Sequence, residues 1–286
     1  MDKDISVIIV SYNTEDLIVD CIKSITDSDS VNSEIFVVDN CSSDNSVKVI
    51  NDNFKDVKLI SNKENRGFGA ANNQVISSCS GKYILFLNPD TLVNHNTLEY
   101  MIRYMDNNPS IGLAGPNVLY PNGSHQDSVS YGYPGQRYGK NDLGNLPGRI
   151  ACVLGACQIV RKDLLLELHG FDEDFFLYGE DQDICLRVRK RGFEIGLIDE
   201  AVIIHYGGKS ERNTNYYEIV KKKCSAEKIF FKKHYSNKSI NKIHLRKKVN
   251  SLFKIITLRS LRLFVKDNIV INEKLSKYQA IYDSYS

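Results

Sequence analysis

Short apolar runs alternate with amphipathic stretches from the start of the chain to about residue 205. Continuous β-branched runs are typical of strands that are buried on both faces, and apolar positions spaced by three and four residues indicate helices. We therefore predict strands over residues 5–10, 35–38, 57–60, 83–87, 111–114 and 201–204. We predict helices over residues 15–25, 44–50, 70–78, 96–105, 162–168 and 179–191. This alternation predicts an α/β fold, with a mostly parallel sheet and helices on both faces.

Polar residues gather where four of the predicted strands end. The first strand is followed by Tyr12-Asn13 and the second by Asp39, while Asn65-Arg66 and Asp90 follow the third and fourth. Turn chemistry explains any one of these clusters alone, because Asn, Asp and Gly are common in turns. Ligands of parallel sheets bind beyond the carboxyl ends of the strands, so four clusters at four strand ends favour a binding site there.

A glycine-bearing turn, Gly67-Phe68-Gly69, opens the helix that follows the third strand. Asn72 stands where a dinucleotide fingerprint has its third glycine, and that fingerprint belongs to the first strand, so we reject a nicotinamide site. The free N–H groups of a helix N-terminus can still bind phosphate, with Arg66 beside them. A plain left-handed turn is an equally good interpretation of this segment alone.

Acidic residues are crowded between positions 172 and 183. Six carboxylates occur there, and like charges this close usually hold cations or move protons. Helix capping explains only one or two of them. Elsewhere, Asp90 in the segment 88–90 is placed to bind a divalent cation on a diphosphate. His205 is a structural histidine unless it faces Asp90, in which case it is a candidate metal ligand.

Taken in order, these segments resemble the successive blocks of glycosyltransferase family 2. The blocks are residues 5–13, 37–40, 65–72, 85–91, 170–183 and 205–210. The resemblance covers about residues 4–215 and implies a GT-A fold, a nucleotide-diphosphate sugar donor and inversion at the anomeric carbon. Within the family, the forms of the segments 88–90 and 170–183 look most like bacterial rhamnosyltransferases of cell-surface polysaccharide assembly.

The resemblance also implies roles for individual residues. Asp181 would be the catalytic base, with Glu180 and Asp183 as supporting acids, and Asp90 and His205 would hold Mg²⁺ or Mn²⁺. The implied nucleotide-binding residues are Ser11, Tyr12, Asn13, Asp39, Arg66, Gly67, Asn72, Asn88 and Asp90. The family's metal motif is usually Asp-x-Asp, but its first position here is Asn88. Asp90 is then the sole carboxylate of the motif, which predicts a modest affinity for metal.

We expect the chain to transfer L-rhamnose from dTDP-rhamnose to a hydroxyl of a lipid-linked saccharide. A UDP-sugar donor is an alternative within the same fold. A non-catalytic nucleotide-sugar or glycan-binding module is disfavoured, because Asp90, Asp181 and His205 are all present. A nucleotidyltransferase is disfavoured because the turn 11–14 lacks a glycine-rich phosphate loop.

Positive charge is concentrated near the C-terminus. Residues 221–266 carry 15 basic residues and one acid, whereas residues 1–220 carry 20 basic and 31 acidic residues. Within this segment, apolar positions at helical spacing are Leu245, Val249, Leu252, Phe253, Ile256, Leu263 and Phe264. The basic residues around them are Arg246, Lys247, Lys248, Lys254, Arg259, Arg262 and Lys266. This pattern predicts an interfacial helix that attaches residues 236–266 to an anionic membrane surface. Packing against protein is the alternative, and we expect no nucleic acid partner because no recognised motif accompanies the charge.

Several global features favour a cytoplasmic protein attached peripherally to the inner face of the cell membrane. The start of the chain lacks the pattern of a signal peptide, and no 18-residue apolar stretch occurs. The seven cysteines include no CxxC pair, so we expect reduced thiols. We predict a nucleotide-sugar-binding half over 1–115, an acceptor-binding and catalytic half over 116–235, and a basic amphipathic helical tail over 236–286. Residues 116–149 are predicted to be a long loop that contributes to specificity. A homodimer is left open.

Overall fold

The computed structural model describes residues 3–27, 31–207, 214–262 and 269–286. The chain forms two compact units. The first comprises residues 1–133, 146–176 and 180–210, and the second comprises residues 134–145, 177–179 and 211–286. The second unit therefore begins earlier in the chain than the predicted tail at 236.

The first unit contains eleven strands and six helices among its described residues. The strands are β1 (Ile5–Ser11), β2 (Ser33–Asp39), β3 (Lys58–Ser61), β4 (Tyr83–Leu87), β5 (Thr91–Val93), β6 (Ile111–Leu119), β7 (His125–Gln126), β8 (Val129–Ser130), β9 (Cys152–Val153), β10 (Cys157–Arg161) and β11 (Glu194–His205). The helices are α1 (Ile18–Thr26), α2 (Ser46–Asn53), α3 (Phe68–Ile76), α4 (Thr97–Asn107), α6 (Lys162–Glu167) and α7 (Glu180–Lys190). The predicted alternation of strands and helices is confirmed.

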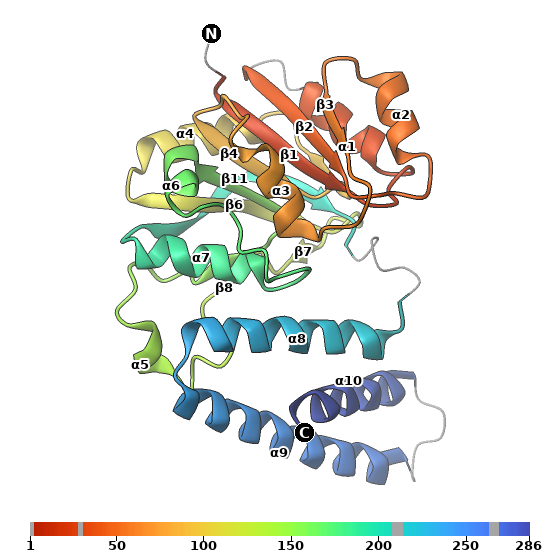
Figure 1. Cartoon of the computed structure of the whole chain (residues 1–286), viewed down its shortest axis with the longest axis vertical. Helices are drawn as coiled ribbons and strands as arrows, with labels where there is room; N and C mark the ends of the chain where they lie inside the picture. Colours follow the sequence, from red (N-terminus) through yellow and green to blue (C-terminus); the bar gives the residue numbers. More distant parts are fainter. Residues whose placement is uncertain (1–2, 28–30, 208–213, 263–268) are drawn as a thin grey trace. The chain divides into compact units, whose positions relative to one another are not determined.

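Nine strands form one sheet in the order β3-β2-β1-β4-β10-β6-β11-β5, with β7 paired to β6. Six of them, β1, β2, β3, β4, β6 and β11, run in one direction, and β5, β7 and β10 run the opposite way. Strand β10 is antiparallel because it enters the sheet at the edge where β4 ends, so that Cys157 lies opposite Leu87. The sheet is thus mostly parallel, as predicted (Figure 1).

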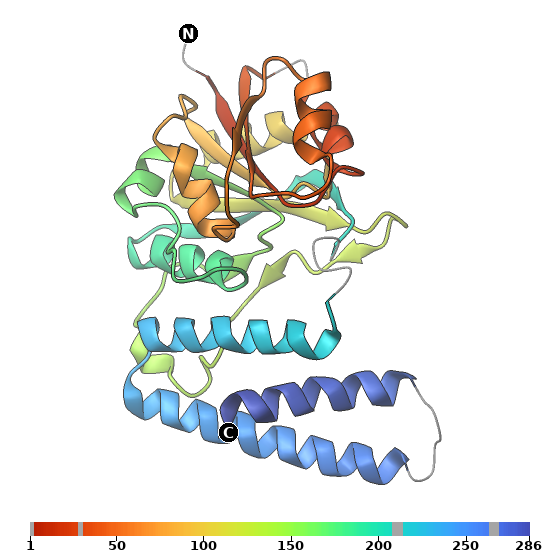
Figure 2. The ribbon, with the colours of Figure 1, turned by 45° about the vertical axis from the view of Figure 1, so that its right-hand side comes forward.

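Helices cover both faces of this sheet (Figures 1 and 2). Val7 and Ile9 of β1 pack in a core with α1 and α4, whereas Ile8 and Val10 pack in a second core with α3, α6 and α7. Successive side chains of a strand point to opposite faces, so a strand that is apolar throughout is buried on both sides. The continuous apolar runs of the sequence are explained by this double burial.

The carboxyl ends of the parallel strands bring the predicted polar clusters together. Ser11 at the end of β1 pairs in register with Asp39 at the end of β2, and Asp39 pairs with Ser61 at the end of β3. On the other side of the sheet, His205 at the end of β11 is in register with Thr91, the residue after Asp90. This edge is therefore the place to look for a functional site.

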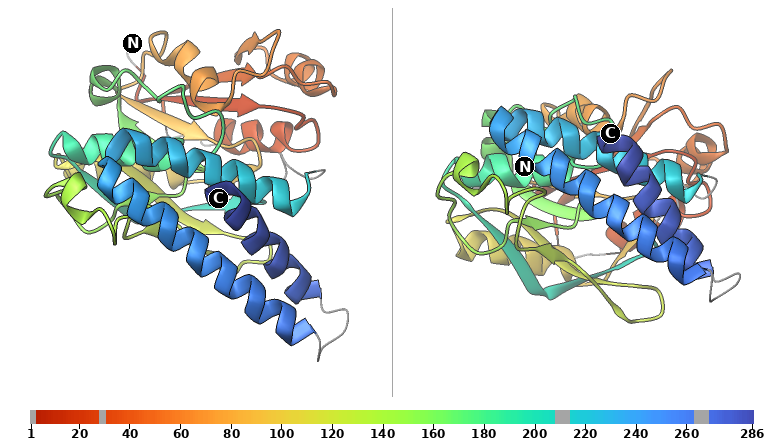
Figure 3. Two further views of the ribbon diagram at one scale, coloured as in Figure 1. Left: turned by 60° about the horizontal axis from the view of Figure 1, so that its bottom comes forward. Right: turned by 90° about the horizontal axis from the view of Figure 1, so that it is seen from below.

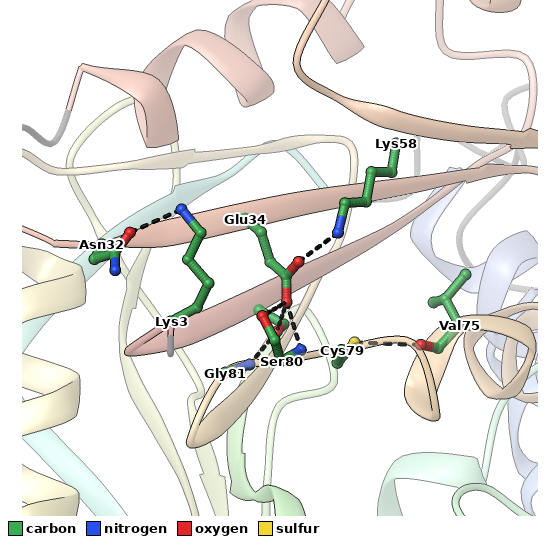
Figure 4. A network of polar contacts seen from close by, with 9 residues as sticks. Lys3, Asn32, Glu34, Lys58, Val75, Cys79, Ser80 and Gly81 are labelled. Carbon is green, nitrogen blue, oxygen red and sulfur yellow. Dashed lines mark hydrogen bonds and ion pairs between the residues drawn. The ribbon is translucent and has the colours of Figure 1, made fainter. Parts of the chain in front are cut away.

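At the opposite edge of the sheet, the carboxylate of Glu34 is held by donors from three directions (Figure 4). It accepts hydrogen bonds from Ser6 Oγ at 2.6 Å and from the backbone N of Ser80 at 2.6 Å, and it pairs with Lys58 Nζ at 2.6 Å. Burial alone would raise the pKa of Glu34, but these donors outweigh burial and lower the pKa to about 2. Glu34 thereby ties β2 to β1, to β3 and to the turn before β4.

The second unit is helical. Its helices are α5 (Lys140–Leu143), α8 (Tyr216–His234), α9 (Asn237–Arg262) and α10 (Ile269–Tyr285). Helices α9 and α10 lie side by side (Figure 3). Glu227 of α8 joins all three long helices, because it pairs with Lys247 of α9 and accepts a hydrogen bond from Tyr285 Oη of α10 at 2.8 Å. The predicted C-terminal helical tail is confirmed, and no helix within the described ranges has the length and apolar character needed to cross a membrane.

The prediction of a long irregular loop over 116–149 is wrong in part. The end of β6 and the short elements β7, β8 and α5 lie within it, and two-residue strands leave no periodic pattern to detect. Strand β11 begins at Glu194, whereas the sequence predicts a strand only from residue 201. The prediction missed the first half of the strand because polar Asp199 and Glu200 interrupt the apolar pattern, at the point where the pairing with β6 shifts register. The predicted residues Lys209, Ser210, Leu263, Phe264 and Lys266 lie outside the described residues.

Candidate active site

Two side chains from different strands meet at the carboxyl edge of the sheet. Asp90 lies in the turn between β4 and β5, and His205 is the last residue of β11. The Oδ1 atom of Asp90 lies 3.3 Å from Nε2 of His205, and the two residues are only 5% and 7% exposed. The structure therefore brings the two predicted metal ligands together in a buried pair.

Gln126 of β7 determines which nitrogen of His205 faces Asp90. Its Oε1 atom lies 3.0 Å from Nδ1 of His205. An amide oxygen can only accept, so Nδ1 carries a hydrogen when it bonds Gln126, and Nε2 is the ring nitrogen that faces Asp90. The sequence analysis missed Gln126, because no motif marks it. The Asn122-Gly123 turn was the only available signal, since that dipeptide favours the hairpin that brings β7 back to β6.

The donor atoms of this pair suit a divalent cation whose remaining ligands come from the substrate and water. A carboxylate oxygen suits Mg²⁺ and Mn²⁺, and an imidazole nitrogen suits the transition metals. In the part of the chain that the structure describes, no group of three or more His, Cys, Asp or Glu side chains is arranged to hold a metal. The protein would thus supply two ligands, which matches sites that bind Mg²⁺ through few protein groups plus phosphates and water.

Asp39 is a buried acceptor at the end of β2. Its Oδ2 atom accepts a hydrogen bond from the backbone N of Ser42 at 3.0 Å. Its Oδ1 atom is buried and has no hydrogen-bond partner among the described residues, although Asp39 is only 2% exposed. Leaving a buried acceptor unpaired is costly, so this oxygen is suited to receive a donor from a ligand, such as a ribose hydroxyl or a base N–H.

The turn after β1 is held against the turn after β2. Asn13 has a φ of 53°, which asparagine tolerates better than most residues, and its Oδ1 accepts a hydrogen bond from the backbone N of Ser43 at 2.8 Å. Ser11 is buried and Tyr12 is exposed in this turn. Because Ser11 pairs in register with Asp39, the structure places these three predicted nucleotide-binding residues beside Asp39.

A side-chain amide connects the end of β2 to the glycine turn before α3. Asn40 donates from Nδ2 to the carbonyl of Gly67 at 3.2 Å and accepts at Oδ1 from the backbone N of Arg66 at 3.0 Å. Gly67 has a φ of +83°, and a Cβ there would lie 2.6 Å from the carbonyl oxygen of Phe176, so this position requires glycine. The sequence analysis missed this role of Asn40. Asn72 is buried on α3, and its Oδ1 has no partner in the described part of the chain.

The acidic start of α7 lies close to the turn that carries Asp90. A Cβ at position 155, in the loop before β10, would lie 3.2 Å from the Cβ of Asp181. The next residue, Ala156, accepts a hydrogen bond at its carbonyl from the backbone N of Asn88 at 2.9 Å. Asp181 is thereby connected through this loop to the segment 88–90.

The three acidic residues of this helix start are in different states. Burial, helped by the negative charge of Asp181, raises the pKa of Glu180 to about 8. Asp183 is only 1% exposed and pairs with Arg187 Nε at 2.6 Å. Asp181 accepts a hydrogen bond at Oδ1 from the backbone N of Gln182 at 2.8 Å.

The acidic segment 172–174 is linked to α3 by side-chain contacts of Asn73. Glu173 accepts a hydrogen bond from Asn73 Nδ2 at 3.0 Å, and Asn73 Oδ1 accepts from the backbone N of Phe171 at 2.8 Å. These contacts hold the segment on α3. Within this crowded acidic segment, the structure gives Glu173 and Asp183 the partners Asn73 and Arg187.

All seven cysteines lie in the described ranges, and none is joined in a disulfide. Six are buried and Cys41 is exposed. Burial raises the pKa of the Cys21 thiol to about 12, which is the opposite of what a nucleophilic thiolate needs.

Comparisons with known proteins concern the sequence and the fold of the chain. The sequence model described as "Glycosyl transferase family 2" matches residues 6–168. The chain is similar to the O-antigen biosynthesis protein RfbC of Myxococcus xanthus, with 29% identity over 161 residues, covering 51% of this chain and 12% of that protein. It is also similar to the N-acetylglucosaminyl-diphospho-decaprenol L-rhamnosyltransferase of Mycobacterium tuberculosis H37Rv, with 22% identity over 206 residues, covering 62% of this chain and 67% of that protein. The chain spans less than half the length of RfbC and of two further curated relatives, an uncharacterized glycosyltransferase of Rickettsia bellii and a poly-beta-1,6-N-acetyl-D-glucosamine synthase of Staphylococcus epidermidis.

Among solved structures, the fold is similar to that of the mannosyltransferase PcManGT of Pyrobaculum calidifontis. That structure, in complex with GDP-Man and Mn²⁺, has a TM-score of 0.64 and 15% identity, covering 99% of this chain and 86% of that one. At this identity the likeness concerns the fold, and it confirms the predicted GT-A architecture.

Proposed function

The chain belongs to glycosyl transferase family 2, and on that premise we propose that it transfers a sugar from a nucleotide-diphosphate donor to a hydroxyl, with inversion at the anomeric carbon. One observation carries the proposal. Asp39, the Asp90–His205 pair and Asp181 are all brought to the carboxyl edge of one sheet. Together they provide for nucleotide recognition, for the charge of the diphosphate and for removal of a proton.

Asp181 is the proposed base. A sugar hydroxyl is a poor nucleophile, so a carboxylate must take its proton while its oxygen bonds to the anomeric carbon. As that bond forms, the bond between the anomeric carbon and the diphosphate oxygen breaks, and a single displacement inverts the configuration. Burial raises the pKa of Glu180, and Asp183 pairs with Arg187, so both are proposed to support the fold around the base.

Asp90 and His205 are the proposed ligands of Mg²⁺ or Mn²⁺. When bound, such a cation neutralises negative charge that develops on a departing diphosphate. Gln126 holds the ring of His205 with Nε2 towards Asp90, so that both ligands are already oriented. Both side chains are buried, so little water surrounds them. Electrostatic attraction to a cation is stronger in such a site than in bulk water.

The nucleotide is proposed to bind around Asp39. The unpartnered Oδ1 of Asp39 is suited to accept a hydrogen bond from the ribose or the base. Exposed Arg66, at the N-terminus of α3, is suited to attract phosphate. The remaining proposed contacts are Ser11, Tyr12, Asn13, Gly67, Asn72 and Asn88.

We propose L-rhamnose from dTDP-rhamnose as the transferred sugar, and a UDP-sugar as the competing donor. A relative at 22% identity whose name is that of an L-rhamnosyltransferase supports the first choice. The name of that relative contains a diphospho-decaprenol, which supports a lipid-linked saccharide as acceptor. A relative named for O-antigen biosynthesis supports a role in bacterial surface polysaccharide assembly.

A lipid-linked acceptor places the reaction at a membrane. We therefore propose that the enzyme works in the cytoplasm, on the inner face of the cell membrane. Residues 236–266 carry nine basic residues and no acidic ones, which suits them to hold the enzyme on anionic lipid.

A nucleotide-release assay with a panel of donors tests the proposed function. With a lipid-linked saccharide and Mn²⁺ present, we expect release of dTDP from dTDP-rhamnose above release from the other donors. Preferential release of UDP would replace the rhamnosyl proposal by the UDP-sugar alternative. Absence of release from every donor would contradict the proposal of glycosyl transfer.

A further inference from the structure

Helix α9 has two apolar faces on opposite sides. Ile243, Ile255 and Leu258 are buried, together with the small polar Ser251. A second set of apolar residues, which we call the outward face of α9, is between 43% and 66% exposed: Leu245, Val249, Leu252, Phe253 and Ile256. At 100° per residue, and viewed along the helix axis, the mean direction of the buried side chains and that of the exposed ones differ by more than a right angle. Among the residues that the structure describes, only one of the two faces is therefore covered.

The buried face is fixed by specific contacts to α8 and α10. Lys247 pairs with Glu227 of α8, and the ring of His244 lies 5.0 Å from that of Tyr285 of α10, in an edge arrangement. Tyr285 in turn donates to Glu227. These contacts set the rotation of α9 about its own axis. The outward face is thus held exposed by the fold of the second unit.

Basic residues line the outward face on both sides. At 100° per residue, Arg246 falls along one margin and Lys248 and Arg259 fall along the other, while Lys242 falls near the first margin, between Val249 and Phe253. All but the half-buried Lys248 are exposed, and α9 contains no acidic residue. An apolar stripe between two rows of cations is the pattern of a helix that lies in a lipid interface, with its long basic side chains reaching the headgroups.

We propose that the outward face of α9 is the surface that lies on an anionic bilayer, with its apolar side chains among the upper acyl chains. This inference rests on the proposed function, because a lipid-linked acceptor requires the enzyme at a membrane. The sequence left open whether this helix packs on protein or on lipid. In the proposed arrangement α9 packs on α8 and α10 with one face and on lipid with the other.

Charge argues against a second copy of this chain as the occupant. Two outward faces brought together would place rows of lysine and arginine opposite each other, and α9 offers no acidic residue to pair with them. Like charges in contact are destabilising. An anionic lipid surface supplies the opposite charge along the whole length of the helix.

Substitutions on the outward face test the proposal better than truncation. Removing the chain after Tyr235 would uncover Val220, Phe230 and Phe231, which are buried in the second unit. The double variant Leu252→Ser/Phe253→Ser changes only exposed positions. Leu166→Ser, at an exposed leucine of α6 in the first unit, is the matched control. Unchanged thermal melts would verify that each variant is folded.

Co-sedimentation of the full chain with vesicles is the measurement. We expect binding to vesicles of phosphatidylcholine with phosphatidylglycerol, and much weaker binding to phosphatidylcholine alone. Leu252→Ser/Phe253→Ser should lose most of this binding, and Leu166→Ser should keep it. Arg246→Gln/Arg259→Gln should weaken binding on the order of tenfold or more, whereas Lys274→Gln/Lys277→Gln, with the same charge change on exposed positions of α10, should have little effect.

Equal binding to both kinds of vesicle, or binding to neither, would overturn the proposal. So would a wild-type dimer, measured by analytical ultracentrifugation, that Leu252→Ser/Phe253→Ser converts to a monomer, because the occupant would then be a second copy. No sugar donor or acceptor is used in the assay. Failure of glycosyl transfer and failure of membrane binding are therefore distinguished.

Discussion

The side-chain oxygen Oε1 of Gln126 lies 3.0 Å from Nδ1 of His205, and the other ring nitrogen lies 3.3 Å from Asp90. Gln126 comes from a two-residue strand at the margin of the sheet, far in sequence from both partners. It acts through His205, so it is a positioning residue. Partners of this kind fix the tautomer and the ring orientation of a metal-binding histidine.

Replacing Gln126 by Leu should weaken metal binding about 10- to 100-fold, because the His205 ring loses the acceptor that orients it. The Mn²⁺ concentration for half-maximal turnover should rise by that factor, and saturating Mn²⁺ should restore most of kcat. Gln126→Glu keeps an acceptor at the same place and should retain more affinity. An unchanged Mn²⁺ requirement in Gln126→Leu would show that Gln126 does not position a metal ligand.

Asp90→Ala should remove most activity and leave the fold intact, because Asp90 is the only carboxylate of the segment 88–90. The measurement is turnover with and without added Mn²⁺, together with a thermal melt. Asp199→Ala, at an exposed aspartate of the same strand as His205, is the matched control and should turn over normally. Full turnover of Asp90→Ala in excess chelator would contradict the metal assignment.

Asp181→Asn should lower kcat about 10²- to 10⁴-fold, because asparagine has nearly the same shape but cannot accept the proton. Donor binding, measured by calorimetry with the nucleotide sugar, should survive, since the base acts on the acceptor. If turnover is retained, another group must accept the proton of the acceptor hydroxyl, and Asp181 is not the base.

Asp183→Asn is the contrasting variant. It leaves Arg187 without its carboxylate partner in a largely buried pair, so the free energy of unfolding should fall on the order of 3 kcal/mol. The folded fraction should still transfer sugar. A variant with normal stability and no activity would instead place Asp183 in the chemistry.

Glu180→Gln should stabilise the protein increasingly as pH rises. Burial and the charge of Asp181 raise the pKa of Glu180 from 4.5 to about 8, so the folded state holds a proton that the unfolded state releases above pH 4.5. Stability is therefore lost as pH rises from 4.5 to about 8, and the neutral glutamine avoids this loss. The melting temperature of the variant minus that of the wild type should be larger at pH 8 than at pH 5. An equal difference at both values would contradict the raised pKa.

Glu34→Gln should show the opposite dependence on pH. Lys58, Ser6 and Ser80 lower the pKa of Glu34 to about 2, against the effect of burial. Its contribution to stability is thus complete above pH 4.5 and is lost as pH falls towards 2. The variant should melt below the wild type at pH 7, and the gap should close in acid. If the difference in melting temperature persists at pH 2, the charge of the Glu34 carboxylate is not what stabilises its contacts with Lys58, Ser6 and Ser80.

The sequence predicts the first unit well where each strand carries its own signal. Strands β1, β2 and β4 contain continuous apolar runs; Asp39 comes directly after one, and Asp90 comes three residues after the end of another. Because these strands are parallel, both residues lie at the same edge of the sheet. Asp90 and His205 meet because β5, which starts directly after Asp90, pairs with the end of β11, so that Thr91 lies opposite His205. A three-residue strand leaves no pattern in the sequence from which this pairing could be predicted.

Other features depend on partners that are distant in the sequence. Glu173 resembles its acidic neighbours in the sequence, and only the packing of its segment on α3 shows that it bonds Asn73. Gln126 is one polar residue among many in a stretch without periodicity. In α9 the apolar residues mark two faces rather than one, so the pattern alone indicated an amphipathic helix but not that half of its apolar surface is already covered.

The most direct test of the central claim is the configuration of the product. Purified full chain would be given the donor sugar selected by the nucleotide-release panel, with its lipid-linked acceptor, and the new glycosidic bond followed by proton NMR with and without a chelator. We predict a product with the anomeric configuration opposite to that of the donor, formed with Mn²⁺ and suppressed by the chelator. A product that retains the donor configuration, or one that forms at the same rate in the chelator, would contradict the account.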